Sequence, residues 1–325
     1  MTIRERKMGA ATRDAYGDVL VEIGAEDPRV VVLDADLSKS TKTGAFAKKF
    51  PERFFNVGIA EANMVGMAAG LATTGYVPFA SSFASFLMCK TFDQLRMGVA
   101  NPRVNAKFVG SHGGVSLGED GASQMAVEDV ALAVALPHFQ VLVPADAQAT
   151  RSLTRAMAAH IGPAFMRTGR PKAPLVYGDD EIFVLGGSKL LQEGDDVTIV
   201  ANGLLVFEAL QAADMAAARG LSVGVLDCYS VKPLDVAAVE RVARRSGALL
   251  VAEEHLTTGG LAAMVSQAVV QRFPVPVDFV GVEDCYGESG TPDALLQHFG
   301  LTAAHLLARL EPLIERKNAR AGATV

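Results

Sequence analysis

The stretch "FFNVGIAEANMVGMAAGLATTGYVPFASS", residues 54–82, decides how the chain folds. Its middle part predicts a helix over 60–74, and the run VPFASS predicts a strand over 77–82. The same alternation of short apolar or β-branched runs with helical patterns of roughly ten to fifteen residues continues along the chain. Alternation of this kind indicates a parallel sheet covered by helices, so the sequence predicts an α/β protein.

The predicted elements form two series. In the first series we expect strands at 29–35, 77–82, 105–111, 139–145 and near PAFMRT (163–168), and helices at 10–25, 60–74, 125–136 and 147–160. In the second series we expect strands at 196–203, 221–229, 248–255 and 276–282, and helices at 204–219, 235–246, 260–272 and 303–317. A segment rich in Gly, Pro and Asp separates the series. We therefore predict two α/β domains, 1–180 and 196–325, joined by a linker at 181–195.

The composition argues against several classes of protein. The balance of 36 acidic against 30 basic side chains gives a formal charge of −6, without a concentrated basic run, which argues against a nucleic-acid partner. The first residues contain no apolar core of a secretory signal, and no apolar run approaches the roughly 18 residues of a membrane span. Cys89, Cys228 and Cys285 are far apart, which fits reduced thiols and makes a poor metal site. We expect a soluble cytoplasmic protein with no metal ligands of its own.

Glu61 is the unusual residue of the opening stretch, because it is the only charged side chain between Val57 and Val77. A lone carboxylate is costly to bury in such surroundings. Either Glu61 points to water at the start of its helix, or the structure needs a carboxylate in an apolar place.

A Gly-rich loop, GSHGGVSLGEDGAS (110–123), follows one predicted strand and precedes a predicted helix. Ligands of open α/β sheets bind at this edge, beyond the carboxyl ends of the strands. The chain has neither GxGxxG nor GxxxxGK[ST], so it offers no dinucleotide fingerprint and no P-loop. Residues 114–118 do match GxSxG, but a nucleophile elbow needs Ser116 at a sharp turn into a helix, and the following GEDG keeps the chain in a loop. A GxSxG hydrolase therefore remains only an alternative.

Several other side chains have ordinary explanations when each is taken alone. His112 and Asp120 can hydrogen-bond within their own loop, and the aromatic pair of SSFASF can belong to the core. Arg13, Arg167 and Arg170 can be surface arginines. A functional assignment has to come from the set.

That set resembles the transketolase family. ATRDAYG, VVLDADLSKST, RFFNVGIAEANMVGMAAGLA, PFASSFASF, FDQLRM, GSHGGVSLGEDGASQMAVED and MRTGRP follow the order and spacing of transketolase motifs. VLDCYSVKPLD and VAEEHLTTGG resemble the C-terminal domain of the family. The resemblance implies two three-layer α/β domains, a thiamine diphosphate pyrimidine-binding domain followed by a transketolase C-terminal domain.

The chain lacks the motifs of the family's first domain. Full-length transketolases hold the cofactor diphosphate and a divalent metal with GDG and, some way on, NN, and neither occurs here. The resemblance therefore implies the second subunit of a split transketolase. Its partner would be an N-terminal subunit with GDG and NN that holds Mg²⁺ and the diphosphate, in an α2β2 assembly.

The family also assigns cofactor roles to residues of this sequence. By resemblance, Glu61 hydrogen-bonds N1′ of the aminopyrimidine of thiamine diphosphate, and so favours the tautomer that removes the proton from C2 of the thiazolium. A desolvated carboxyl shares a proton readily, which explains the apolar setting. Phe83 and Phe86 would pack on the pyrimidine, Asp36 would line the thiamine site, and Gln124 would lie near the cofactor and the donor substrate.

The substrate residues follow from the same motifs. Arg13, Ser40, His112 and Arg170 match the family's binders of a sugar phosphate, and two guanidinium groups, an imidazole and a hydroxyl suit a tetrahedral anion. Asp120 matches a residue that contacts substrate hydroxyls. The expected reaction moves a two-carbon ketol unit from a ketose to an aldose.

Some alternatives stay open at this point. The chain could be a subunit of another thiamine diphosphate enzyme, either a 2-oxo-acid dehydrogenase or a deoxyxylulose-phosphate synthase, although GEDGASQM fits transketolase better. It could also be a non-catalytic relative, but Glu61 and the anion-binding set are present. Cys89 lies near the place of an aromatic side chain in some members, and we assign it no role. The sequence does not name the sugar or the pathway.

Overall fold

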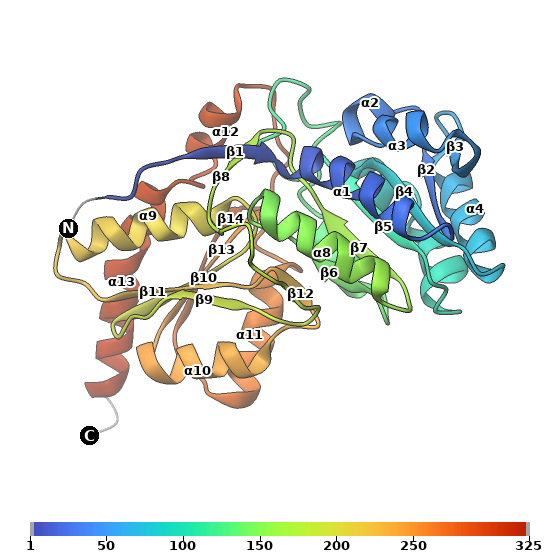
Figure 1. Ribbon diagram of the computed structural model, residues 1–325. Helices are drawn as coiled ribbons and strands as arrows, with labels where there is room; N and C mark the ends of the chain where they lie inside the picture. The colour runs from blue at the N-terminus through green and yellow to red at the C-terminus, as the bar shows by residue number, and fades with distance from the viewer. Residues whose placement is uncertain (1–2, 323–325) are drawn as a thin grey trace.

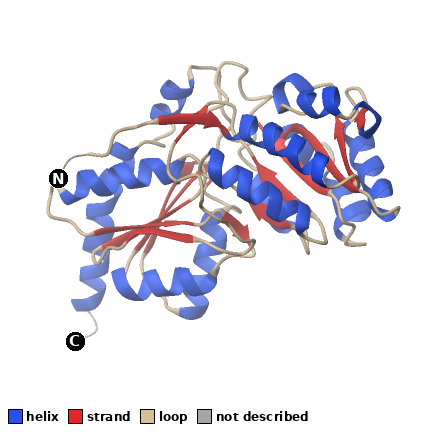
Figure 2. Cartoon of the chain, in the orientation of Figure 1, coloured by secondary structure: helices blue, strands red, loops and turns tan. Residues whose placement is uncertain are grey.

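The computed structural model describes residues 3–322, which form two α/β domains, each with helices on both faces of a central sheet. Figure 1 shows the domains side by side, and Figure 2 shows helices above and below both sheets. The predicted fold class, two three-layer α/β domains, is confirmed.

The first sheet has seven strands in the order β12-β6-β7-β5-β4-β2-β3. Every neighbouring pair is parallel except β12 with β6, which is antiparallel. The strands are β2 (Val30–Asp34), β3 (Phe54–Asn56), β4 (Val77–Phe83), β5 (Lys107–Ser111), β6 (Gln140–Leu142), β7 (Ala164–Arg167) and β12 (Ser230–Lys232). The central strands β2, β4 and β5 are buried along their whole length, as expected for a sheet covered on both faces.

Two groups of helices cover this sheet. On one face α1 (Thr12–Glu26) packs against α8 (Ala147–Ala159) and α3 (Gly44–Lys49). On the other face lie α4 (Glu61–Thr73), α5 (Ala84–Cys89), α7 (Asp129–Ala135) and the π-helical turn η2 (Leu95–Ala100). Short turns complete the domain: α2 (Ser38–Thr41), η1 (Pro51–Arg53) and α6 (Phe92–Gln94).

The second sheet has five strands in the order β14-β13-β10-β11-β9, parallel except for β9. They are β9 (Lys189–Gln192), β10 (Val197–Ala201), β11 (Val223–Asp227), β13 (Leu249–Leu256) and β14 (Val277–Val282). Helices α9 (Leu205–Ala217) and α13 (Ala303–Gly322) pack together on one face, and α10 (Val236–Ser246) and α11 (Leu261–Arg272) on the other. Helix α12 (Pro292–His298) precedes α13.

The two domains are interlocked rather than simply consecutive. Strand β12 comes from the second half of the chain but adds to the edge of the first sheet. In the opposite direction, the N-terminal segment runs along α9, where Arg4 forms an ion pair with Asp214 and Arg6 with Glu208 (Figure 1). Strand β1 (Met8–Ala11) then pairs with β8 (Lys172–Pro174). These crossings hold the domains in one arrangement.

Most predicted strands and helices occur within a few residues of their expected ends. The segment 181–195, predicted as a linker, contains β9, which is part of the second sheet. Sequence analysis did not foresee the short helices that follow β4, or the pairing of β12 with the first sheet. Among the described residues no helix is long and apolar enough to cross a membrane.

Candidate functional site

Glu61 lies in the first turn of α4, close to the carboxyl edge of the first sheet, and is only 5% exposed. A carboxylate is stabilised at the N-terminus of a helix, where unpaired backbone N–H groups and the helix dipole favour negative charge. Its Oε1 lies 3.4 Å from Nζ of Lys90, a half-exposed side chain that follows α5. Glu61 is therefore a buried acid with an ammonium partner, not a surface residue.

Phe86 and Glu61 contact the same lysine side chain. The Nζ atom of Lys90 lies 4.2 Å from the centroid of the Phe86 ring as well as close to the Glu61 carboxylate. One ammonium group therefore contacts both, so the carboxylate and the aromatic face lie on either side of Lys90 Nζ. An aromatic face beside a carboxylate suits a flat, nitrogen-containing ring with a proton to share, and these residues fit an aminopyrimidine.

Phe83 connects Phe86 to the Gly-rich loop. Its ring is stacked with Phe86 at a centroid distance of 5.5 Å and with the imidazole of His112 at 3.8 Å. Phe83 ends β4 and His112 follows β5, its paired neighbour in the sheet. Adjacent carboxyl ends of parallel strands thus bring the two rings together, as the sequence predicts for this edge.

His112 is held as a neutral imidazole. Burial lowers its pKa to about 3, with further lowering by the nearby cations Arg13, Arg170 and Lys42. Its Nε2 lies 3.2 Å from Nη1 of Arg13, and its Nδ1 lies 2.8 Å from Oγ of Ser111. Because a guanidinium can only donate, Nε2 is the acceptor and Nδ1 carries the hydrogen.

Four of the predicted substrate residues converge here. Arg13, in the first turn of α1, donates from Nη1 to the carbonyl of Ser40 at 3.1 Å as well as to His112. Its Nε is buried without a partner. Arg170 lies close enough to lower the pKa values of both Arg13 and His112. Two cations gathered beside a neutral imidazole form a site that favours an anion.

Arg170 also contacts the Gly-rich loop. Its Nη1 donates to the carbonyl of Leu117 at 2.5 Å, and lies 3.3 Å from the Glu119 carboxylate and 3.8 Å from that of Asp120. Asp120 is therefore placed beside the cationic cluster on an exposed turn. Arg170 therefore holds the loop through Leu117, while 35% of its side chain stays exposed to solvent.

The remaining predicted residues lie around this centre. Asp36 follows β2 in the left-handed region, with φ of 64°, and pairs with the side chain of Asn56. Gln124 is half-buried; its side chain donates to Ser123, and its carbonyl accepts from Ser85 of α5. Among the described residues, neither side chain hydrogen-bonds to Glu61 or His112. Their cofactor roles stay predictions.

Asp34 is a supporting residue that sequence analysis did not single out. Its carboxylate accepts hydrogen bonds from the hydroxyls of Thr41 and Thr43 and from the backbone N–H of Leu37. These bonds fix the LSKST segment, and with it the Ser40 carbonyl that holds Arg13. The sequence does hold a sign of this role, because Asp34 is an acidic residue at the end of the apolar strand in VVLDAD.

Other chemistry finds little support at this edge. Ser116 of the GxSxG match is fully buried, and in the described part of the chain no imidazole hydrogen-bonds to its Oγ. Burial, followed by the neighbouring Glu128, raises the pKa of Cys89 to about 12, so this thiol is not a ready nucleophile. Among residues 3–322 no group of three His, Cys, Asp or Glu side chains could hold a metal ion.

Comparison with protein families gives two matches. Residues 8–175 match the transketolase pyrimidine-binding domain, and residues 186–306 match the transketolase C-terminal domain. Together the two matches span most of the chain.

Individual relatives are similar over nearly their whole length. The 6-deoxy-6-sulfo-D-fructose transketolase subunit SqwH of Clostridium sp. (strain MSTE9) is 40% identical over 95% of this chain and 96% of its own. A subunit of the apulose-4-phosphate transketolase of Phocaeicola vulgatus is 35% identical over 90% of this chain and 93% of its own. A solved structure described as a split gene transketolase, inactive beta4 tetramer, is 48% identical with a TM-score of 0.89, covering 95% of this chain and 100% of that one.

Proposed function

Because this chain belongs to the transketolase family, we propose that it is the C-terminal subunit of a split transketolase. It transfers a two-carbon ketol unit from a ketose to an aldose with thiamine diphosphate, and it recognises a terminal anion on the sugar. Two of the relatives are named after sugars of this kind: the Clostridium subunit after a sulfo-sugar and the Phocaeicola subunit after a sugar phosphate. A cytoplasmic location stays a prediction from the sequence.

One observation carries the proposal: a continuous row of contacts joins the two halves of the site. The row begins at the Glu61 carboxylate, runs through the Lys90 ammonium to the stacked rings of Phe86 and Phe83, and ends at His112 and Arg13. A bound ring at one end and a bound anion at the other would place a sugar chain between them. This arrangement suits a phosphorylated or sulfonated sugar that reacts at its far end.

Glu61 would hold the cofactor's aminopyrimidine by sharing a proton with it, while Phe83 and Phe86 pack against the ring and exclude water. The bound cofactor supplies the electron sink for cleavage of a bond next to a carbonyl. Glu61 is only 5% exposed, so its carboxylate is kept out of bulk water, where its proton would exchange with solvent and its charge would be screened.

The cationic end would hold the substrate rather than react with it. Arg13 has an unpartnered Nε, and Arg170 has an exposed edge, so both can turn N–H groups toward an anion. Binding energy from this remote group fixes the position of the reacting carbon and so lowers the barrier of the chemical step.

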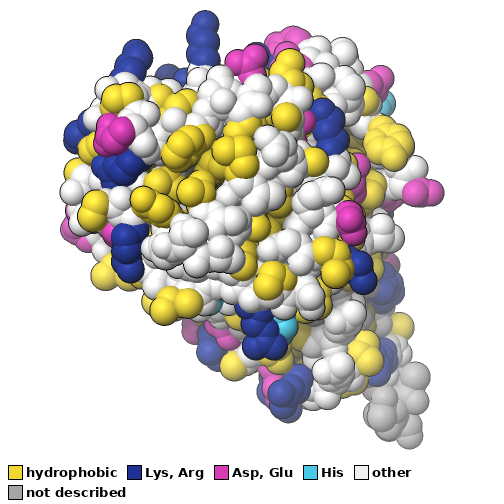
Figure 3. Space-filling view, turned by 90° about the vertical axis from the view of Figure 1, so that its right-hand side faces the viewer, with side chains coloured by type: hydrophobic (Ala, Val, Ile, Leu, Met, Phe, Trp, Pro, Cys, Tyr) yellow, Lys and Arg dark blue, Asp and Glu magenta, His cyan; other side chains and the backbone are white. Residues whose placement is uncertain are grey.

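We further propose that a separate N-terminal subunit supplies the metal and diphosphate site and that the assembly is α2β2. The face of the molecule formed by α4 and η2 exposes apolar side chains: Ile59, just before α4, is 80% exposed, Met97 in η2 is 50% exposed and Met67 in α4 is 36% exposed. Figure 3 views the molecule from this side and shows apolar side chains across its centre, with few charged side chains among them. An exposed apolar surface of this kind suits subunit association.

Calorimetry and kinetics of the reconstituted protein test the proposal. The chain alone should bind thiamine diphosphate and Mg²⁺ weakly and show no turnover. Addition of a partner with GDG and NN should restore tight cofactor binding and ketol transfer between a phosphorylated or sulfonated ketose and an aldose. Tight metal-dependent cofactor binding by this chain alone would contradict the split-subunit assignment, and a reconstituted assembly that transfers no ketol unit would contradict the activity.

A further inference from the structure

The Gly-rich loop is closed at its neck by hydrogen bonds. The backbone N–H of Gly114 donates to the carbonyl of Ala126 at 2.8 Å, and the N–H of Gly113 donates to the carbonyl of Thr168 at 3.2 Å. Residues 114–126 therefore form a closed loop, with His112 just before its neck and Asp120 at its tip. These two hydrogen bonds fix the ends of the loop, and so help to set the positions of the His112 and Asp120 side chains.

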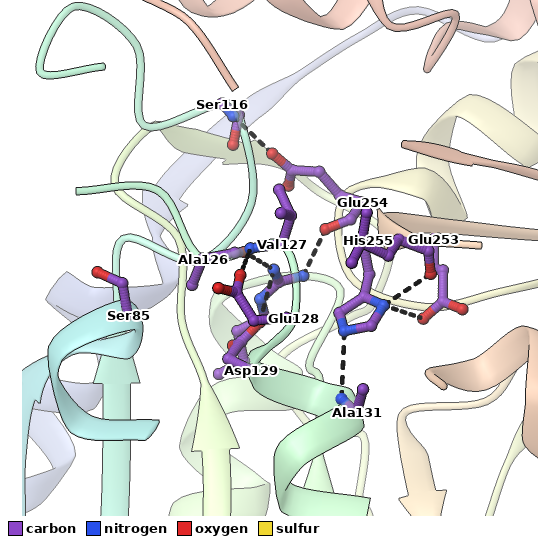
Figure 4. Close-up of polar contacts among 12 residues, drawn as sticks. Ser85, Ser116, Ala126, Val127, Glu128, Asp129, Ala131, Glu253, Glu254 and His255 are labelled. Carbon is purple, nitrogen blue, oxygen red and sulfur yellow. Dashed lines mark hydrogen bonds and ion pairs between the residues drawn. The ribbon is translucent and has the colours of Figure 1, made fainter. Parts of the chain in front are cut away.

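Glu254, from β13 of the second domain, reaches into this neck. Its Oε1 accepts the backbone N–H of Ser116 at 2.6 Å, as Figure 4 shows. Gly114, with φ of +80°, makes room for this contact, because a Cβ atom there would lie 2.2 Å from the carboxylate. The side chain is 6% exposed, so the contact is made in the interior between the domains.

Arg167, from β7 of the first domain, ties Glu254 to the other side of the neck. Its Nη1 donates to the carbonyl of Glu254 at 2.6 Å, and its Nη2 donates to the carbonyl of Ala126 at 2.5 Å. Nη2 also lies 3.0 Å from the carboxylate of Asp129, at the start of α7. A Cβ atom at Gly113 would lie 2.1 Å from Arg167 Nε, so this glycine too is required by a protein contact.

The tip of the loop is also enclosed by the second domain. A Cβ atom at Gly118 would lie 3.1 Å from Pro292, and one at Gly121 would lie 2.5 Å from Ser289 Oγ. On the facing segment, a Cβ atom at Gly287 would meet Met125 at 2.2 Å. The second domain therefore contacts one side of the loop from neck to tip.

We propose that Glu254 and Arg167 are positioning residues, through which the second domain sets the substrate-binding conformation of the Gly-rich loop. The inference rests on the proposed function. Glu254 holds Ser116, the next residue, Leu117, accepts from Arg170 at 2.5 Å, and Arg170 belongs to the cationic end of the site. The second domain thus shapes the anion-binding end without contributing a side chain to it.

Three variants of the reconstituted assembly test this role in kinetics. Glu254→Ala leaves the Ser116 N–H buried without an acceptor, and we expect kcat/KM for a phosphorylated aldose to fall by about 10- to 100-fold, the cost of a lost hydrogen bond to a charged group. The reaction with glycolaldehyde, which has no anion, should fall much less. Glu254→Gln keeps an acceptor oxygen and should restore most of the discrimination, because its side-chain amide oxygen can still accept the Ser116 N–H.

Glu253→Ala is the matched control. Glu253 is the neighbouring buried acid on β13, and its carboxylate accepts the backbone N–H groups of Leu261 and Ala262 at the start of α11. Its loss should lower the melting temperature in the same way as Glu254→Ala. Because Glu253 does not touch the loop, the ratio of the two acceptor activities should stay at the wild-type value.

Hydrogen exchange of the full chain gives a readout independent of activity. The peptide containing residues 114–126 should exchange faster in Glu254→Ala than in wild type or Glu253→Ala. Unchanged exchange in this peptide, or equal losses with both acceptors, would overturn the positioning role. A wild-type assembly without ketol transfer would instead refute the proposed function, and the exchange experiment would still decide whether Glu254 holds the loop.

Discussion

Replacement of Arg13 is the most direct test of the anion-binding end, because this side chain makes few hydrogen bonds to the rest of the protein. It projects from the first turn of α1, and its guanidinium hydrogen-bonds to the Ser40 carbonyl and to His112. Arg170, by contrast, also holds the loop through Leu117, so its loss would mix structural and binding effects. We therefore choose Arg13→Gln, which removes the charge, and Arg13→Lys, which keeps the charge and loses the planar fork.

The expected loss of activity follows from a hydrogen-bond donor of Arg13 that has no partner in the protein. Its Nε is buried and unpartnered, and a hydrogen bond between a guanidinium and an anion contributes about 1.5–3 kcal/mol. Arg13→Gln should therefore lower kcat/KM for a phosphorylated or sulfonated acceptor by roughly 10- to 100-fold. Arg13→Lys should recover only part of this loss, because a lysine cannot make the same bidentate contact.

Steady-state kinetics of the reconstituted assembly with two acceptors measures the effect. Glycolaldehyde has no terminal anion, so its kcat/KM should change little in either variant. Arg151→Gln serves as a control, since Arg151 pairs with Asp18 and Glu22 on the surface of α1 and α8. Equal losses with the anionic and the neutral acceptor would show that Arg13 acts on the fold, and the anion site would have to be withdrawn.

Two further predictions follow from the same row of contacts. Glu61→Gln keeps the shape of the side chain but not its proton sharing, so ketol transfer should fall by about 10²–10⁴-fold while assembly stays intact; activity near the wild-type level would exclude the assigned role. His112 has its pKa lowered to about 3, mainly by burial, so its Hε1 resonance should not titrate between pH 5 and 8, and Arg13→Gln should raise that pKa because one neighbouring cation is removed. Since the folded pKa lies below the unfolded value near 6.5, this histidine contributes stability that is complete above pH 6.5 and is lost as the pH falls toward 3; a titration midpoint near 6.5 in the folded chain would contradict this.

Local sequence patterns predict much of this architecture because each domain repeats one simple unit. A buried strand such as β2 or β10 reads as a short, mostly apolar and β-branched run, and the helices between strands have ordinary lengths and ends. The carboxyl edge of the sheet follows from that alternation, which is why His112 could be placed at a ligand-binding edge before its neighbours were known. Motif resemblance then supplied the expected roles of Glu61 and Phe86, whose shared contact with Lys90 no periodicity would reveal.

Contacts between the domains could not be predicted in this way. Strand β12 is three residues long and pairs with a strand almost ninety positions earlier, so nothing in SVK itself indicates its sheet. Lys90 is a similar case, since a lysine after an apolar helix gives no sign that its ammonium will lie between Glu61 and Phe86. Both depend on the relative placement of elements that are far apart in the sequence.

The glycines of the Gly-rich loop show how such placement changes the interpretation of a motif. From sequence alone, a Gly-rich loop at a sheet edge suggests a backbone that a ligand approaches closely. In the folded chain the side chains that approach Gly113 and Gly114 are Arg167 and Glu254, one from each domain. His112 and Asp120, the residues of this segment that we propose to face the substrate, lie outside this neck. The glycines thus serve the contact between the domains, and under the proposed function the second domain, by occupying the inner side of the loop, leaves the polar side chains on its outer side to face a substrate.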